Sequence, residues 1–251
     1  MQLHLQAFSS QKAGNDVEEC DDAASHEGKA DFDGLIFRGA VADGATESSF
    51  SGIWARMLVR AFKSAKLTFP DEDGTLPLLQ ERWRRIVGKK KLPWYAEQKA
   101  QSGAFAALAG VVMRDDPDTG RMSWHAVAAG DSCLFHVRGD EVLASFPFSH
   151  PEQFSARPLL IASIPERNGD LEQSVKSADG AFCTDDTFFL MTDALACWFT
   201  KGMLEGTKPW SRLRDLATSE EETPFDEMIT SLRASGELKN DDTTVLRIDV
   251  L

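Results

Sequence analysis

Hydrophobic and polar residues follow one another along the chain in short patterns that predict several strands. The segment Leu3 to Phe8 alternates weakly between the two kinds of residue and predicts a first strand. Residues 9 to 34 are polar and rich in Gly, Ser and Asp, which predicts a loop. The apolar run from Leu35 to Ala42 predicts a buried strand that enters a tight turn at Asp43 and Gly44.

Helical periodicity is clearest in the second quarter of the chain. Apolar residues at helical spacing predict a helix over residues 53 to 65, with Ser51 as its N-cap. Residues 77 to 109 are expected to be mostly helical, with a break near Pro93.

The rest of the chain combines strands with further helices. The strand-like stretches are residues 110–114, 123–129, 133–137, 142–146, 187–192 and 243–250. Gly139 and Asp140 predict a hairpin turn between two of these strands. A helix is expected to begin within 195 to 199, and two more lie within 207 to 235, separated near Pro224. Strands in clusters, with helices grouped between them, favour a layered α+β fold in one domain over residues 1 to 251.

Composition and charge exclude several classes of protein. The chain is 42% hydrophobic and 27% charged, which is ordinary for a globular protein. It shows no secretory signal and no apolar stretch near the roughly 18 residues that cross a bilayer, so we expect a cytoplasmic monomer without membrane contact. A net charge of -13 argues against a nucleic-acid partner, because nucleic acid binds patches of Lys and Arg.

The cysteines do not indicate a metal or disulfide framework. The chain has four, Cys20, Cys133, Cys183 and Cys197, and none forms a CxxC pair. We therefore expect reduced thiols and no zinc site.

Acidic residues stand beside apolar strands at several places, namely Asp43, Asp131, Asp193 and the pair Asp241 and Asp242. One such Asp is typical of a turn or a cap. Several buried carboxylates together would repel one another and lose hydration, and a divalent cation offsets that cost. Hard Mg²⁺ or Mn²⁺ prefers oxygen ligands, so the pattern predicts an aspartate metal site, although periodicity does not show that these acids converge.

Five short motifs contain these acids. In chain order they are Cys20-Asp21-Asp22-Ala23, Val41-Ala42-Asp43-Gly44, Ala129-Gly130-Asp131-Ser132, Met191-Thr192-Asp193-Ala194 and Asp241-Asp242-Thr243-Thr244. Their order and spacing resemble those of the metal-dependent protein phosphatases of type 2C, from about residue 10 to the C-terminus. The stretch Phe148 to Phe154, followed by Arg157 and Pro158, resembles a bacterial branch of that family.

This resemblance implies a fold and a place for the site. The fold is a four-layer α-β-β-α sandwich with two central antiparallel sheets, and the metal site lies at one end of the sheets. The implied site residues are Asp21, Asp22, Asp43, Gly44, Asp131, Asp193 and Asp241. Of these, Asp43 would bridge two metals, and Gly44 would offer its carbonyl oxygen to one of them.

The other implied ligands divide between the two metals. Asp193 and Asp241 would hold one ion, and Asp21 the other, with Asp22 bonding metal-bound water. Asp131 matches the position of a weaker third ion. The roles of Asp21 and Asp22 are not separable from the sequence.

The implied activity is hydrolysis of phosphoserine and phosphothreonine in proteins, with two Mn²⁺ or Mg²⁺ ions that bridge and activate one water. The implied partner is a phosphorylated protein, the target of a kinase. The chain departs from the family pattern at Val17, where many members have a phosphate-binding Arg, and at Ala45 and Thr46, where many have a His. It also departs at Cys133 and Ala194, so the groups that bind the phosphate and protonate the leaving group stay open.

Two alternatives use the same residues differently. Asp31-Phe32-Asp33-Gly34, with Gly130-Asp131-Ser132, resembles motifs of the haloacid-dehalogenase phosphatases, but the residues before Asp31 are too polar for the buried strand that such enzymes need. A pseudophosphatase that binds metal and recognises a phosphoprotein without turnover is motivated by the missing Arg. The retained acidic residues argue against it.

Overall fold

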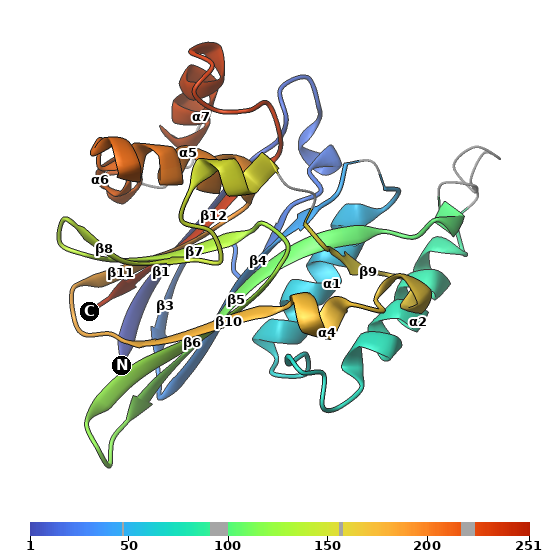
Figure 1. The fold of residues 1–251 in the computed structure, drawn as a ribbon, viewed down its shortest axis with the longest axis horizontal. Helices are drawn as coiled ribbons and strands as arrows, with labels where there is room; N and C mark the ends of the chain where they lie inside the picture. Colours follow the sequence, from blue (N-terminus) through green and yellow to red (C-terminus); the bar gives the residue numbers. More distant parts are fainter. Residues whose placement is uncertain (47, 91–99, 156–157, 217–223) are drawn as a thin grey trace.

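Two antiparallel six-stranded sheets lie face to face, and helices cover the outer side of each sheet (Figure 1). This computed structural model describes residues 1–46, 48–90, 100–155, 158–216 and 224–251. The predicted four-layer α-β-β-α sandwich is therefore confirmed. The predictions at Pro93 and Arg157 lie outside the described residues.

The first sheet has the strand order β3-β1-β12-β11-β7-β8. Its strands are β1 (Gln2–Ser10), β3 (Gly28–Asp33), β7 (Cys133–Arg138), β8 (Glu141–Phe146), β11 (Asp186–Met191) and β12 (Thr243–Val250). The first and last strands pair along their whole length, from Leu3 opposite Val250 to Ser10 opposite Thr243. The two ends of the sequence thus lie side by side within this sheet.

The second sheet has the order β10-β6-β5-β4-β2, and a short strand β9 also pairs with β5. Its strands are β2 (Ala23–Ala24), β4 (Ile36–Gly44), β5 (Phe105–Asp116), β6 (Arg121–Ala129), β9 (Ile161–Ala162) and β10 (Lys176–Ala181). The central strands β4 and β5 are apolar on both faces because one face meets the other sheet and the opposite face meets helices.

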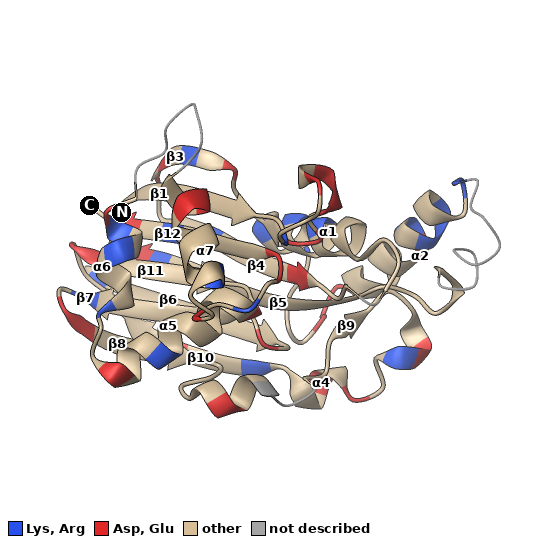
Figure 2. Ribbon diagram, turned by 90° about the horizontal axis from the view of Figure 1, so that it is seen from above, with Lys and Arg blue, Asp and Glu red and all other residues tan. Residues whose placement is uncertain are grey.

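The helices form the two outer layers. The longer ones are α1 (Ser51–Lys63) and α2 (Thr75–Val87) on the second sheet, and α5 (Asp193–Glu205), α6 (Pro209–Arg214) and α7 (Pro224–Ala234) on the first. The short elements are η1 (Val17–Glu19), η2 (Pro151–Ser155), η3 (Pro165–Arg167) and α4 (Leu171–Ser174). In Figure 2, basic segments occur on α1, α2 and α6, separated by acidic and uncharged ones. None of the described helices is long and apolar enough to cross a membrane.

Three buried clusters hold the layers together. Leu5, Val41 and Leu246 lie in the cluster between the two sheets. Trp54 belongs to the cluster beneath α1, and Phe199 belongs to the one beneath α5. Each fully buried side chain of this size contributes about 1.5–3 kcal/mol, so the sandwich is a firm support for the loops at its ends.

Two predictions about secondary structure are wrong. Residues 9 to 34 are not all loop, because they contain η1, β2 and β3. Strand β3 is an edge strand that pairs with β1 through its backbone and leaves most of its side chains exposed, so no hydrophobic pattern marks it. The helix expected to continue to residue 109 gives way to β5 at Phe105. A strand that is buried on both faces has no polar alternation to distinguish it from a buried helix.

The start of α1 also differs from its prediction. Ser51 is the first helical residue, and the N-cap position is Phe50, in the left-handed region at φ 62°. The Ser51 hydroxyl does not cap its own helix but donates to the Asp21 carboxylate at 2.8 Å. Strand β4 also continues through Asp43 and Gly44, where a turn was predicted.

Candidate metal centre

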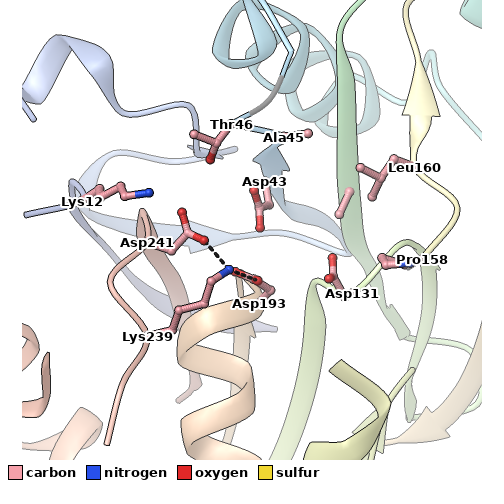
Figure 3. A pocket seen from close by; sticks show the side chains of 11 residues that line it. Lys12, Asp43, Ala45, Thr46, Asp131, Pro158, Leu160, Asp193, Lys239 and Asp241 are labelled. Atoms are coloured by element: carbon pink, nitrogen blue, oxygen red, sulfur yellow. Dashed lines mark ion pairs between the residues drawn. The ribbon is translucent and has the colours of Figure 1, made fainter. Parts of the chain in front are cut away.

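Four of the predicted aspartates lie where strands end at the same edge of the sandwich (Figure 3). Asp43 is the next-to-last residue of β4, and Asp131 lies between β6 and β7. Asp193 follows β11 and begins α5, whereas Asp241 precedes β12. Because β11 and β12 are antiparallel, the chain leaves one strand beside the point where it enters the other. The topology therefore brings together acids that are far apart in the sequence.

These four acids share one cavity of about 540 Å³. The residues that line it are Lys12, Asp43, Ala45, Thr46, Ala107, Asp131, Pro158, Leu160, Asp193, Lys239 and Asp241. Four carboxylates and two ammonium groups thus face a common space. This is a polar site that suits a cation or a strongly charged ligand more than an apolar one.

Asp22 is not one of the residues that line the cavity, and it is only 7% exposed. Its Oδ2 accepts a hydrogen bond from the Thr192 hydroxyl at 2.9 Å. Its Oδ1 is buried and has no hydrogen-bond partner among the described residues. A buried carboxylate oxygen without a partner is costly, and a cation is the kind of partner that would satisfy it.

The Asp21 side chain contacts the start of α1 and not the cavity. Its two carboxylate oxygens accept hydrogen bonds from the Ser51 hydroxyl and from the Gly52 backbone amide, both at 2.8 Å. Asp21 thus serves the N-terminus of α1 as a cap from a distant part of the chain, where a negative charge is favourable. The structure does not bring this carboxylate into the cavity.

Gly44 is needed for the close approach of two segments. A Cβ at this position would lie 2.6 Å from the backbone oxygen of Asp21 and 2.9 Å from Cβ of Ser51. Any side chain would push apart β4, the loop that carries Asp22 and the start of α1. Gly44 itself does not line the cavity.

Burial and mutual repulsion raise the pKa of the central acids. Burial raises the pKa of Asp43 well above its ordinary value, and the neighbouring charges of Asp22 and Asp193 raise it further. Burial, followed by the charges of Asp242 and Asp193, does the same for Asp22. Asp43 and Asp193 also affect the pKa of one another. Without a cation these acids therefore hold a proton more tightly than an isolated aspartate does.

Two further groups adjust the charge at the wall of the cavity. Burial, with the charge of Asp193, raises the pKa of Asp131 to about 6. Lys239 Nζ lies 2.6 Å from Asp241 Oδ2 and 3.7 Å from Asp193 Oδ2. The ammonium group is a cation that the chain itself places between two predicted metal ligands (Figure 3).

The acids line the cavity, but their side chains do not converge on a common point. Among the described residues, no three acidic, His or Cys side chains converge as a ready-made coordination sphere. The donor set nevertheless fits a hard divalent cation, because it consists of carboxylates, one with an unsatisfied buried oxygen. A cation that used Asp193 or Asp241 would compete with Lys239 for these carboxylates.

Sequence reasoning missed Lys12 and Lys239 at this site, and it did not predict the structural role of Asp242. Asp242 accepts hydrogen bonds from the backbone amides of Lys12 and Asp21, both at 2.8 Å, and so ties their loop to the loop before β12. Lys12 and Lys239 are the two cations in the cavity lining. Lys239 could have been predicted at the site, because the run Lys239-Asn240-Asp241-Asp242 places a cation next to acids. Lys12 could not have been predicted there, because its position depends on the fold of a polar loop.

The residues of the haloacid-dehalogenase alternative are separated in space. Asp31 lies on the edge strand β3, with its side chain 82% exposed, and pairs with His4 at 2.7 Å. It does not line the cavity that contains Asp131. The geometry therefore gives this alternative no support.

Comparison with known proteins gives a likeness in fold. No family model matches the chain, and no curated protein does. Among solved structures, it is similar to the catalytic domain of the serine/threonine phosphatase PstP in complex with two manganese ions, at 14% identity and a TM-score of 0.60 over 100% of both chains. It is also similar to PstP of Mycobacterium tuberculosis, at 14% identity and a TM-score of 0.59, covering 100% of this chain and 99% of that one. A structure of a bacterial serine phosphatase matches at 12% identity and a TM-score of 0.58, covering 98% and 97% of the two chains.

The chain thus has the fold of the bacterial serine/threonine phosphatases along its whole length. The resemblance that the motifs predicted is confirmed at the level of the fold. Identities this low establish architecture and not activity, because one fold hosts many functions.

Proposed function

We propose that this protein is a metal-dependent phosphatase that hydrolyses phosphoserine and phosphothreonine in a partner protein. The observation that carries the proposal is the group formed by Asp22, Asp43 and Asp193. All three have a raised pKa caused first by burial. A protein gains no stability from repelling buried acids, so their presence points to a function.

The residues would divide the work as follows. When bound, two Mn²⁺ or Mg²⁺ ions would supply an activated water and offset charge on the phosphoryl group. Asp43 interacts with the charges of both Asp22 and Asp193, which suits it to be shared by both ions. Asp193 and Asp241, already joined through Lys239, would hold one ion.

The unsatisfied oxygen of Asp22 supports a direct role for Asp22 at the other ion, with Thr192 fixing its orientation. Asp21 would then have a structural role, because its hydrogen bonds hold the loop that carries Asp22 against the start of α1. Asp131 would serve a third, weaker ion. These roles differ from those that the resemblance implies, in which Asp21 binds metal directly and Asp22 binds through water.

The proposal is tested by phosphate release from phosphoserine, phosphothreonine and phosphotyrosine peptides, with Mn²⁺ or Mg²⁺ and with a chelator. We expect metal-dependent release from the first two peptides. Release that persists in the chelator, or no release under any condition, would contradict the proposal.

A second candidate function is binding of metal and a phosphoprotein without turnover. The observation in its favour is the Lys239–Asp241 ion pair, in which a cation of the chain itself neutralises a predicted metal ligand. Binding of a phosphopeptide in the presence of Mn²⁺, without release of phosphate, would identify this function.

A further inference from the structure

Lys12 is a cation in the cavity whose side chain has no partner within the described residues. It lies in the loop that follows β1 and lines the cavity together with Asp43 and Asp241. Its ammonium group points toward these acids (Figure 3). In the part of the chain that the structure describes, this ammonium forms no ion pair and no hydrogen bond, whereas Lys239 pairs with Asp241 and Asp193.

The backbone around Lys12 is held in place on both sides. The Lys12 amide donates to Asp242 Oδ1 at 2.8 Å, and the Ala13 amide donates to Asn240 Oδ1 at 2.8 Å. Arg233 Nη1 donates to the Gln11 carbonyl oxygen at 2.9 Å. Three consecutive residues are therefore fixed against a neighbouring segment, so the base of the Lys12 side chain has a defined position.

The same contacts fix Lys12 relative to the acids. Arg233 also donates through Nη2 to the Asp241 carbonyl oxygen at 2.6 Å. One guanidinium group thus joins the loop of Lys12 to the loop of Asp241. These contacts hold the backbone of Lys12 next to the acidic cavity.

The balance of acidic and basic charge in the cavity indicates a role for the Lys12 ammonium group. The lining of the cavity contains four carboxylates and two lysines, so the acidic charge exceeds the basic charge. Two divalent cations would neutralise most of the acid charge. Lys12 would then stand at the rim of a site with excess positive charge, which attracts an anion.

We propose that Lys12 is a substrate-binding residue that contacts the phosphoryl oxygens of the phosphate monoester. This inference rests on the proposed function. Lysine binds phosphate as a point charge with rotatable donors. Val17, the position where the sequence lacks an expected Arg, is 70% exposed on η1 and does not line the cavity, whereas Lys12 does.

The test measures phosphate binding separately from turnover. Binding of inorganic phosphate to the full chain is followed by calorimetry in saturating Mg²⁺, for wild type, Lys12→Met and Lys12→Arg. Loss of one charged hydrogen bond should weaken phosphate binding roughly tenfold to a hundredfold in Lys12→Met. Lys12→Arg should recover most of this loss because it retains the charge. Lys66→Met removes an exposed lysine that lies beyond the C-terminal end of α1 and should bind phosphate like wild type.

Metal titration separates this role from a structural one. Removing a positive charge beside carboxylates should not weaken Mn²⁺ binding, so Lys12→Met should bind Mn²⁺ at least as tightly as wild type. A collapsed site would lose affinity for both metal and phosphate. In steady-state hydrolysis of nitrophenyl phosphate at saturating Mn²⁺, we expect Lys12→Met to raise KM.

The outcomes distinguish this inference from the proposed function. Equal phosphate affinity in wild type and Lys12→Met would overturn the inference, and so would no phosphate binding by wild type. If wild type binds phosphate through Lys12 yet releases none from any ester, the role of Lys12 stands and the proposed catalysis fails.

Discussion

Lys239 forms an ion pair with Asp241, with Nζ 2.6 Å from Oδ2. The pair joins a predicted metal ligand to a cation that belongs to the chain. Any metal that uses Asp241 must therefore compete with Lys239. The lysine side chain is 66% exposed, so it can swing into solvent without a large cost.

The first prediction follows from this competition. Partly exposed ion pairs contribute about 0.2–1 kcal/mol, so Lys239→Met should tighten Mn²⁺ binding by up to about fivefold. Isothermal titration with Mn²⁺ measures the change, and Lys239→Arg, which keeps the charge, should stay near wild type. Weaker Mn²⁺ binding by Lys239→Met would mean that the lysine supports the metal site.

The second prediction separates Asp21 from Asp22. Asp21→Ala removes two hydrogen bonds at the start of α1 and should lower stability by about 0.5–2 kcal/mol while the protein still responds to Mn²⁺. Asp22→Asn replaces a buried acid that is costly to ionise with a neutral amide and should leave the metal-free protein at least as stable as wild type. It should also abolish the stabilisation by Mn²⁺. Urea unfolding at neutral pH, with and without Mn²⁺, measures both effects, and the opposite pattern would assign the metal to Asp21.

The sequence predicted the acids of this site but not their arrangement. Asp43, Asp131, Asp193 and Asp241 could be found because each stands at the end of an apolar strand. Asp21 and Asp22 could not be separated, since the difference depends on where α1 begins. The carboxylate of Asp21 meets an amide 31 residues further along the chain, and no local pattern encodes such a contact.

The same limit applies to the fold. Strands β6, β7, β8, β11 and β12 were predicted within a few residues because their apolar patterns and turns are local. The edge strand β3 was missed because backbone pairing with β1, and not side-chain burial, defines it. Lys12 was missed for a related reason, since its place in the cavity depends on Asp242 and Arg233, which lie more than 200 residues away.

The third prediction concerns pH. The pKa of Asp131 is raised from its ordinary value of 3.8 to about 6, chiefly by burial. The folded state therefore binds this proton more tightly than the unfolded state does. Its contribution to stability is complete below about pH 4 and is lost as the pH rises through about 6, and it is worth up to about 3 kcal/mol.

The measurement is the melting temperature of the metal-free protein between about pH 4 and pH 7. Asp131→Asn should gain stability relative to wild type as the pH rises through this range, because the variant has no proton to lose. A constant difference between the two proteins across the range would contradict the account. Stabilisation by Mn²⁺ should grow with pH in wild type, since the ion binds deprotonated acids.

The fourth prediction concerns the leaving group. Ala45 and Thr46 line the cavity and offer no titrating group, and His150 is exposed and does not line it. A serine alkoxide leaves more readily with a general acid, by about 10²–10⁴-fold, whereas nitrophenolate does not need one. We expect high activity on nitrophenyl phosphate relative to phosphoserine peptides, and Ala45→His should help the peptide more than the aryl ester.

The pH profiles of the two substrates check this prediction. An acidic group that already donates the proton would give the phosphopeptide a bell-shaped profile with a limb near neutrality that the aryl ester lacks. That result would show that another group in the site protonates the leaving oxygen.

The central claim is that Asp43 and its neighbours form a catalytic metal site. The most direct measurement is Mn²⁺-dependent hydrolysis of a phosphoserine peptide by wild type and Asp43→Asn, alongside the shift in melting temperature that Mn²⁺ causes in each protein. Metal stabilisation is worth several kcal/mol, so Asp43→Asn should fold, lose more than about nine-tenths of the turnover and respond much less to Mn²⁺. Turnover by Asp43→Asn close to that of wild type, or an equal Mn²⁺ shift in both proteins, would show that the metal acts elsewhere.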